Sequence, residues 1–135
     1  LRKKHPHIKV LLTGKRRQYV IQQLNKNNIQ YKYFEMCDFN TLNELYNCLD
    51  LYIVSSRVEG GPRAINECAL TKTPIYSTKV GIYELLLNKE SIFDVDNPET
   101  IINCVSNTTY NYEKSQLYTI KNYMHNYTSL LVNNL

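Results

Sequence analysis

The chain has 135 residues, of which 43% are hydrophobic and 21% are charged. This composition fits one ordinary domain and excludes an intrinsically disordered chain, which would have few apolar residues and a high charge. The formal net charge of +4 has its clearest sources in residues 2–4 and 15–17. Such basic runs are typical of a solvated surface, and an anionic ligand or an anionic membrane surface is the alternative.

The four cysteines form no C-x-x-C pair, and no histidine lies at a metal-like spacing from any of them. Cys48 and Cys68 fall inside apolar patterns, which predicts buried free thiols of a reducing compartment. The sequence contains no signal-peptide pattern and no apolar run near the roughly 20 residues of a transmembrane helix. We therefore predict a cytoplasmic protein, with association at a membrane surface left open.

Short runs rich in branched residues alternate with amphipathic segments along the chain. The runs predict strands at 8–14, 29–35, 51–56, 73–81 and 91–95. The segments between them predict helices at 15–28, 40–50, 62–72, 82–88 and 97–107, followed by a long amphipathic helix over 112–135. Such alternation indicates an α/β fold with a doubly wound, mostly parallel, Rossmann-like sheet. We expect Asn40 or Thr41 to cap the second helix and Asn97 to cap the fifth.

In a doubly wound sheet the ligand lies beyond the carboxyl ends of the strands. Gly14 and Lys15, the loop at 55–61, and residues 79–81 each follow a predicted strand. The pattern therefore predicts that these three loops line one edge of the sheet.

The stretch "EGGPRAINE" at 59–67 enters a helix through Gly-Gly-Pro. Pro62 suits the first helical turn, where its missing N–H is not needed. Free amides around Gly60, Gly61, Arg63 and Ala64, together with the helix dipole, predict an anion site, and a simple tight turn is the alternative.

Two glutamates flank this predicted anion site. Glu59 lies in the loop, and Glu67 lies about one and a half turns into the helix. Carboxylates can accept two hydroxyl donors each, so this pair could hold a polyol on either side of a diphosphate. The alternative for Glu67 is a side chain that faces solvent.

The segment from 41 to 86 resembles the donor-binding half of the family-four (group 1) retaining glycosyltransferases, which have the glycosyltransferase-B fold. Glu59 and Glu67 match the E-x7-E spacing of that family. The frame around them also agrees: Asp50 and an apolar strand before Ser56, then a "TP" before a strand that ends near Gly81. The resemblance implies an enzyme that transfers a sugar from a nucleotide-diphosphate sugar with retention of configuration.

The resemblance also implies a role for each matched position. Glu59 would contact the transferred sugar, and Glu67 the ribose of the nucleotide. No metal ion or other cofactor is expected, because the nucleotide sugar is itself the donor substrate. The remaining predicted substrate contacts are Gly14 and Lys15 near the nucleotide, Glu35 and Met36 near the base, and Ser56, Gly60, Gly61, Pro62, Arg63 and Ala64 around the sugar and diphosphate.

The sequence departs from the family pattern where Gly-Gly-Pro-Arg follows Glu59, and where Gly81 stands alone in place of two glycines. The Arg and Lys that grip the diphosphate in this family have no match here, since their strand-helix unit would precede residue 1. We therefore expect half of a two-domain fold that lacks this unit and an N-terminal acceptor domain. As part of a longer chain it would be a retaining, hexosyl-type glycosyltransferase, and we expect this piece alone to bind the donor without catalysing transfer. Residues 1–110 would form the nucleotide-sugar-binding domain and 111–135 a C-terminal helix.

The alternative function is a non-catalytic nucleotide-binding or protein-interaction module with the same fold. Nucleic-acid binding is not predicted, because the aromatic residues fall mostly on apolar stripes and offer no stacking platform.

Overall fold

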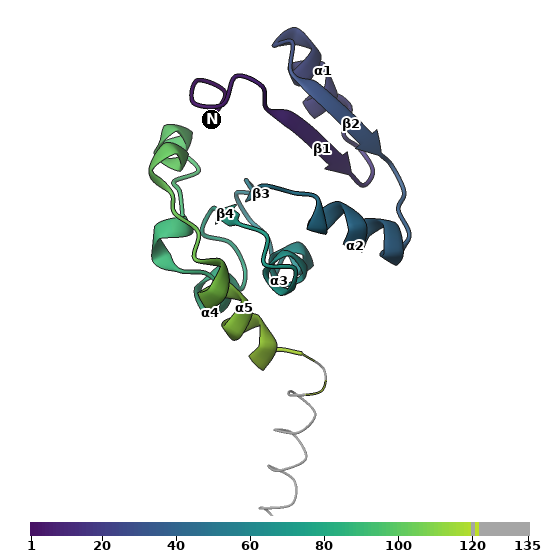
Figure 1. Ribbon diagram of the computed structural model, residues 1–135. Helices are drawn as coiled ribbons and strands as arrows, with labels where there is room; N and C mark the ends of the chain where they lie inside the picture. The colour runs from purple at the N-terminus through teal and green to yellow at the C-terminus, as the bar shows by residue number, and fades with distance from the viewer. Residues whose placement is uncertain (120, 122–135) are drawn as a thin grey trace, which may run out of the picture. The chain divides into compact units, whose positions relative to one another are not determined.

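The computed structural model describes residues 1–119 and 121 (Figure 1). Contacts divide the chain into two compact units, residues 1–45 and 46–135. The first unit holds β1 (Lys9–Thr13), α1 (Gln18–Lys26), β2 (Gln30–Phe34) and most of α2 (Phe39–Asn47). The second holds β3 (Tyr52–Val54), α3 (Arg63–Leu70), β4 (Ile75–Ser77), α4 (Tyr83–Leu86), the 3-10 turns η1 (Lys89–Ser91) and η2 (Pro98–Asn103), and α5 (Thr108–Leu117).

Both units are built on a parallel strand pair, which confirms the predicted α/β class. β1 pairs with β2 from Lys9 opposite Gln30 to Thr13 opposite Phe34. β3 pairs with β4 from Tyr52 opposite Ile75, and their ladder runs for three residues. Parallel neighbours require a crossover, and α1 and α3 are the helices that supply it.

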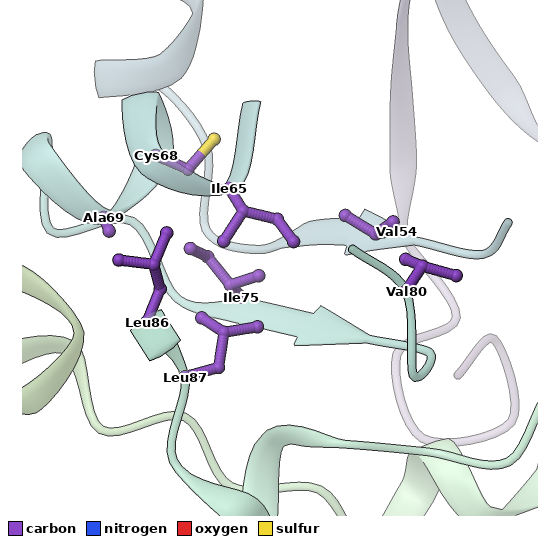
Figure 2. Packing of buried hydrophobic residues seen from close by; sticks show 8 residues of the cluster. All are labelled: Val54, Ile65, Cys68, Ala69, Ile75, Val80, Leu86 and Leu87. Carbon is purple, nitrogen blue, oxygen red and sulfur yellow. The ribbon is translucent and has the colours of Figure 1, made fainter. Parts of the chain in front are cut away.

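The core of the second unit lies between α3 and the β3–β4 pair (Figure 2). Ile65, Cys68 and Ala69 occupy positions i, i+3 and i+4 of α3, so they share one face, and all three are fully buried. Figure 2 shows them beside Val54, Ile75, Val80, Leu86 and Leu87 from the strands and the α4 region. Burial of a side chain such as Ile65 contributes about 1.5–3 kcal/mol to the free energy of unfolding. This packing holds α3 against the β3–β4 pair.

Helix α5 is fastened to the same unit by buried polar groups. Ser115 is fully buried, and its hydroxyl donates to Oδ1 of Asn66 on α3 at 2.8 Å. Asn111 is also fully buried and accepts from the amide of Asn88 at 3.3 Å. Because each buried polar atom has a partner, these contacts hold α5 in one position against α3.

Several sequence predictions are corrected in detail. Asp38, not Asn40 or Thr41, caps α2, because its carboxylate accepts from the amide of Thr41 at 2.7 Å. The side chain of Asn97 makes no cap bond, and the segment after it is the 3-10 turn η2. The fifth predicted strand is reduced to an isolated parallel bridge between Ser77 and Ile92.

The four cysteines are free thiols, as predicted, and Cys68 and Cys104 are buried. Cys48 is exposed, which corrects the prediction for it. The half-buried neighbours Leu45, Tyr46 and Leu49 share one side of the chain at the end of α2, and Cys48 falls on the other side.

Helix α5 covers the start of the predicted C-terminal helix. The rest of that helix falls at 120 and 122–135, outside the described residues. The division into a domain at 1–110 and a helix at 111–135 stays a prediction.

The cap of α2 predicts a pH dependence of stability. The Thr41 amide lowers the pKa of Asp38 from its ordinary value of 3.8. The cap therefore stabilises the fold fully above pH 3.8 and loses its effect as the pH falls through the lower folded-state pKa. Asp38→Asn keeps a cap acceptor but cannot titrate, so its unfolding temperature should fall less than that of the wild type between about pH 4 and 2. Parallel pH profiles for the two proteins would contradict this assignment.

Candidate functional site

The candidate site is built where β3 and β4 end. Beyond the ladder, the amide of Thr78 donates to the carbonyl of Val54 at 3.0 Å. The buried Thr78 hydroxyl then donates to the carbonyl of Ser56 at 2.6 Å. These two bonds keep the strand ends together, so the loops that follow β3 and β4 leave the sheet side by side.

The two loops meet at a contact between glycine backbones. Gly81 has φ +56°, a conformation that disfavours any residue with a Cβ. A Cβ at Gly81 would lie 2.6 Å from the Cα of Gly61 and 3.0 Å from Cδ of Pro62. Only glycine fits at position 81. Its contact with Gly61 and Pro62 fixes the two residues that precede α3.

The start of α3 presents free backbone donors. The amides of Gly60, Gly61, Arg63 and Ala64 have no hydrogen-bond acceptor among the described residues. Pro62, which is buried, takes the N-cap position. Amides at the start of a helix, reinforced by its dipole, form a site suited to an anion.

Gly60 differs from Gly61 and Gly81 in its surroundings. A Cβ at Gly60 would meet no atom within 4 Å, and its φ is not in the left-handed region. The chain's own packing thus gives no steric reason for glycine at this position. Gly60, Gly61 and Arg63 are all exposed, so a ligand can approach the chain here.

A cavity of about 330 Å³ opens beside the first turns of α3. One side is polar and comes from α3, and the other is apolar and comes from the α4 region and the end of α5. The lining residues are Gly61, Arg63, Asn66, Glu67, Ile82, Leu85, Leu86 and Tyr118. Arg63 is the only cation among these lining residues, so the cavity combines one positive charge with one carboxylate.

Glu67 is half-buried at this cavity, and its carboxylate has one hydrogen-bond partner in the described part of the chain. The hydroxyl of Tyr46 donates to its Oε2 at 2.8 Å. Burial, followed by the bond to the Glu67 carboxylate, raises the pKa of Tyr46 far above its ordinary value. Tyr46 therefore remains protonated and acts as a donor at every physiological pH.

The neighbouring thiol of Cys68 belongs to the core and not to the site. Burial, and secondarily the charge of Glu67, raises the pKa of Cys68 well above its ordinary value of 9.0. A thiol in this state carries almost no thiolate, so it is not an effective nucleophile.

Glu59 and Ser56 lie outside the cavity lining. Glu59 is exposed and makes no hydrogen bond or ion pair with any described residue. Ser56 contributes its carbonyl to the Thr78 bond. Of the predicted contacts in this unit, the structure brings Gly61, Arg63 and Glu67 together at the cavity, while Glu59, Gly60 and Ala64 lie along the adjoining chain.

The remaining predicted contacts belong to the first unit, at the carboxyl ends of β1 and β2. Gly14 has φ +85°, donates its amide to the carbonyl of Phe34 at 3.1 Å and accepts from the hydroxyl of Tyr33 at 3.0 Å. Lys15, Glu35 and Met36 are exposed in the loops that follow these strands.

Sequence reasoning did not identify Tyr46, Asn66 or Tyr118 as parts of the site. Tyr46 and Glu67 are 21 residues apart, and Tyr118 lies just beyond α5. Each was assigned to an apolar or helical pattern, and nothing in its local sequence distinguishes it from a residue with only a packing role.

Comparison with protein families identifies the chain. The family model described as glycosyl transferases group 1 matches residues 1–111. The chain belongs to this family of glycosyltransferases.

This assignment confirms the predicted resemblance, and glycosyl transfer is the activity of the family. No curated protein matches the glycosyltransferase chain significantly. In the described residues, no helix combines the length and the hydrophobicity needed to cross a membrane.

The contact between Gly61 and Gly81 predicts different effects for two similar substitutions. Gly81→Ala should lower the free energy of unfolding by at least about 1–2 kcal/mol, because the left-handed conformation is strained and the Cβ collides with Gly61. Gly60→Ala should change it by less than about 0.5 kcal/mol. Chemical denaturation of the three proteins measures both values, and equal destabilisation by the two substitutions would contradict the packing described here.

Proposed function

We propose that this glycosyltransferase domain binds a nucleotide-diphosphate sugar and contributes the donor site for transfer of that sugar to an acceptor. The observation that carries the proposal is the combination of free amides at the start of α3 with Arg63 and Glu67 at one cavity. A diphosphate anion and hydroxyl-bearing sugars are two chemical parts of such a donor, and this arrangement offers groups suited to both.

In the proposed binding mode, the diphosphate lies at the amides of Gly60 to Ala64, with Arg63 as an additional cation. Backbone donors and the helix dipole need no metal ion to bind a phosphate. Glu67 accepts hydrogen bonds from the hydroxyls of the ribose, and Glu59 accepts them from the hydroxyls of the transferred sugar. The proposed roles of Gly14, Lys15, Glu35 and Met36 at the nucleotide and base follow from the family resemblance alone.

Transfer with retention is proposed from the family resemblance. Neither carboxylate is placed as an obvious covalent nucleophile, so front-face departure of the diphosphate is proposed in place of a covalent intermediate. Glu67 is engaged with Tyr46, and Glu59 lies in an exposed loop. Departure of the diphosphate would then be assisted by donors aimed at the charge that develops on it, and the acceptor would approach from the same face. A further N-terminal domain would bind the acceptor. A cytoplasmic location, with association at a membrane surface left open, is also part of this proposal.

Binding measurements can separate the two glutamates. Glu67→Ala should weaken binding of a nucleoside diphosphate and of its sugar conjugate alike, by roughly 10- to 100-fold, because both contain ribose. Glu59→Ala should weaken binding of the sugar conjugate only. UDP, GDP and ADP, each with and without a hexose, are titrated by calorimetry against the wild type and both variants.

Glu99→Ala is the matched control, since Glu99 is an exposed glutamate on η2 in the same unit. It should leave every affinity unchanged. An unchanged affinity for the nucleoside diphosphate in Glu67→Ala would show that the ribose assignment is wrong.

The alternative, a binding module without catalysis, is distinguished by turnover. An enzyme cleaves the sugar from its donor and releases the nucleoside diphosphate, slowly with water and faster with an acceptor. A module that only binds leaves the sugar conjugate intact. Chromatography of the donor after incubation with the chain joined to the proposed N-terminal acceptor domain, in the presence of an acceptor, decides between them.

A further inference from the structure

The hydrogen bond between Tyr46 and Glu67 joins two helices at the cavity. Tyr46 lies in the last turn of α2, and Glu67 lies in the middle of α3. The phenol oxygen is 2.8 Å from Oε2 of Glu67, and Glu67 lines the cavity. One carboxylate oxygen is thus occupied by a donor from the protein, and Oε1 has no partner among the described residues.

Tyr46 is itself held on two sides. Its ring packs edge to face with that of Tyr52, with centroids 6.0 Å apart and planes at 88°. Its carbonyl accepts from the hydroxyl of Thr73 at 2.8 Å, and the Thr73 hydroxyl is also 2.8 Å from that of Thr71. The ring and the backbone of Tyr46 are therefore both held, which places the phenol oxygen beside the Glu67 carboxylate.

A glutamate on a helix has three rotatable side-chain bonds, and binding through it requires that they be ordered. A hydrogen bond from the protein that already holds one carboxylate oxygen lowers the entropy lost when the ligand binds. The remaining oxygen keeps both lone pairs for incoming hydroxyl groups. Tyr46 donates reliably because its raised pKa keeps the phenol protonated.

We infer that Tyr46 is a positioning residue, which orients the Glu67 carboxylate so that its free oxygen accepts the vicinal hydroxyls of the donor ribose. This inference rests on the proposed function, in which Glu67 binds ribose. Recognition of ribose over deoxyribose then depends on the Tyr46 hydroxyl, which does not itself contact the ligand.

The test compares a ribonucleoside diphosphate with its 2′,3′-dideoxy counterpart in calorimetric titrations of the chain. Tyr46→Phe removes only the hydroxyl and retains the ring against Tyr52 and the carbonyl for Thr73, so the variant should fold. We expect it to bind the ribonucleotide about 3- to 10-fold more weakly and the dideoxynucleotide as the wild type does. In a Glu67→Ala background, Tyr46→Phe should cause no further loss.

Tyr83→Phe is the matched control. The hydroxyl of Tyr83 donates to Oε1 of Glu84 at 2.7 Å, so the chemistry of the pair is the same, but neither residue lines the cavity. This variant should bind both ligands as the wild type does.

Two results would overturn the inference. Equal weakening of both ligands by Tyr46→Phe would assign Tyr46 a structural role, and unchanged binding of both would assign it none. A failure of the proposed function is distinguishable, because it appears in the wild type alone as no preference for the ribonucleotide over the dideoxynucleotide. That result would remove the basis of the inference as well.

Discussion

The backbone contact between Gly61 and Gly81 is the constraint on which the candidate site depends. It can form only because Thr78 continues the β3–β4 ladder to Ser56 and delivers both loops to the same point. With a Cβ at Gly81, the loop before α3 would have to move, since Gly61 is in van der Waals contact. The first residues of α3 are placed by this contact from one side and by the burial of Ile65 from the other. The free amides and Glu67 therefore belong to a helix whose start is held by packing on both sides.

The cavity beside that helix start is asymmetric in its chemistry. Arg63, Asn66 and Glu67 supply polar groups from successive turns of α3, and Ile82, Leu85 and Tyr118 supply apolar surface opposite them. The bond between Ser115 and Asn66 fixes α5 against α3, which places Tyr118 at the cavity. Ligand sites of this kind combine a mostly apolar wall with a few polar groups that set orientation. The family match shows a glycosyltransferase domain. A nucleotide sugar, with charged, hydroxyl-bearing and flat aromatic parts, is the ligand that we propose for this cavity.

Much of this account was accessible from the sequence, because its signals are local. Branched apolar runs located four strands, and the Gly-Gly-Pro entry and the spacing of Glu59 and Glu67 located the helix start and the family. The rest depends on contacts between distant segments. Nothing local distinguishes Tyr46 as the partner of Glu67 or Gly81 as the partner of Gly61. Asp38 was missed as a cap because Asn40 and Thr41 are equally good cap residues, and only the position of the first helical turn decides among them.

The central claim is that the amides at the start of α3 bind the diphosphate of the donor. The most direct measurement is a titration of the ¹⁵N-labelled chain with UDP, GDP and ADP, followed by amide chemical shifts. Binding of the diphosphate at this helix start should produce saturable downfield shifts of the Gly60, Gly61, Arg63 and Ala64 amide protons with at least one of the three nucleotides, because each amide gains a charged acceptor. Shifts confined to the basic runs at 2–4 and 15–17, with the four amides unmoved, would contradict it.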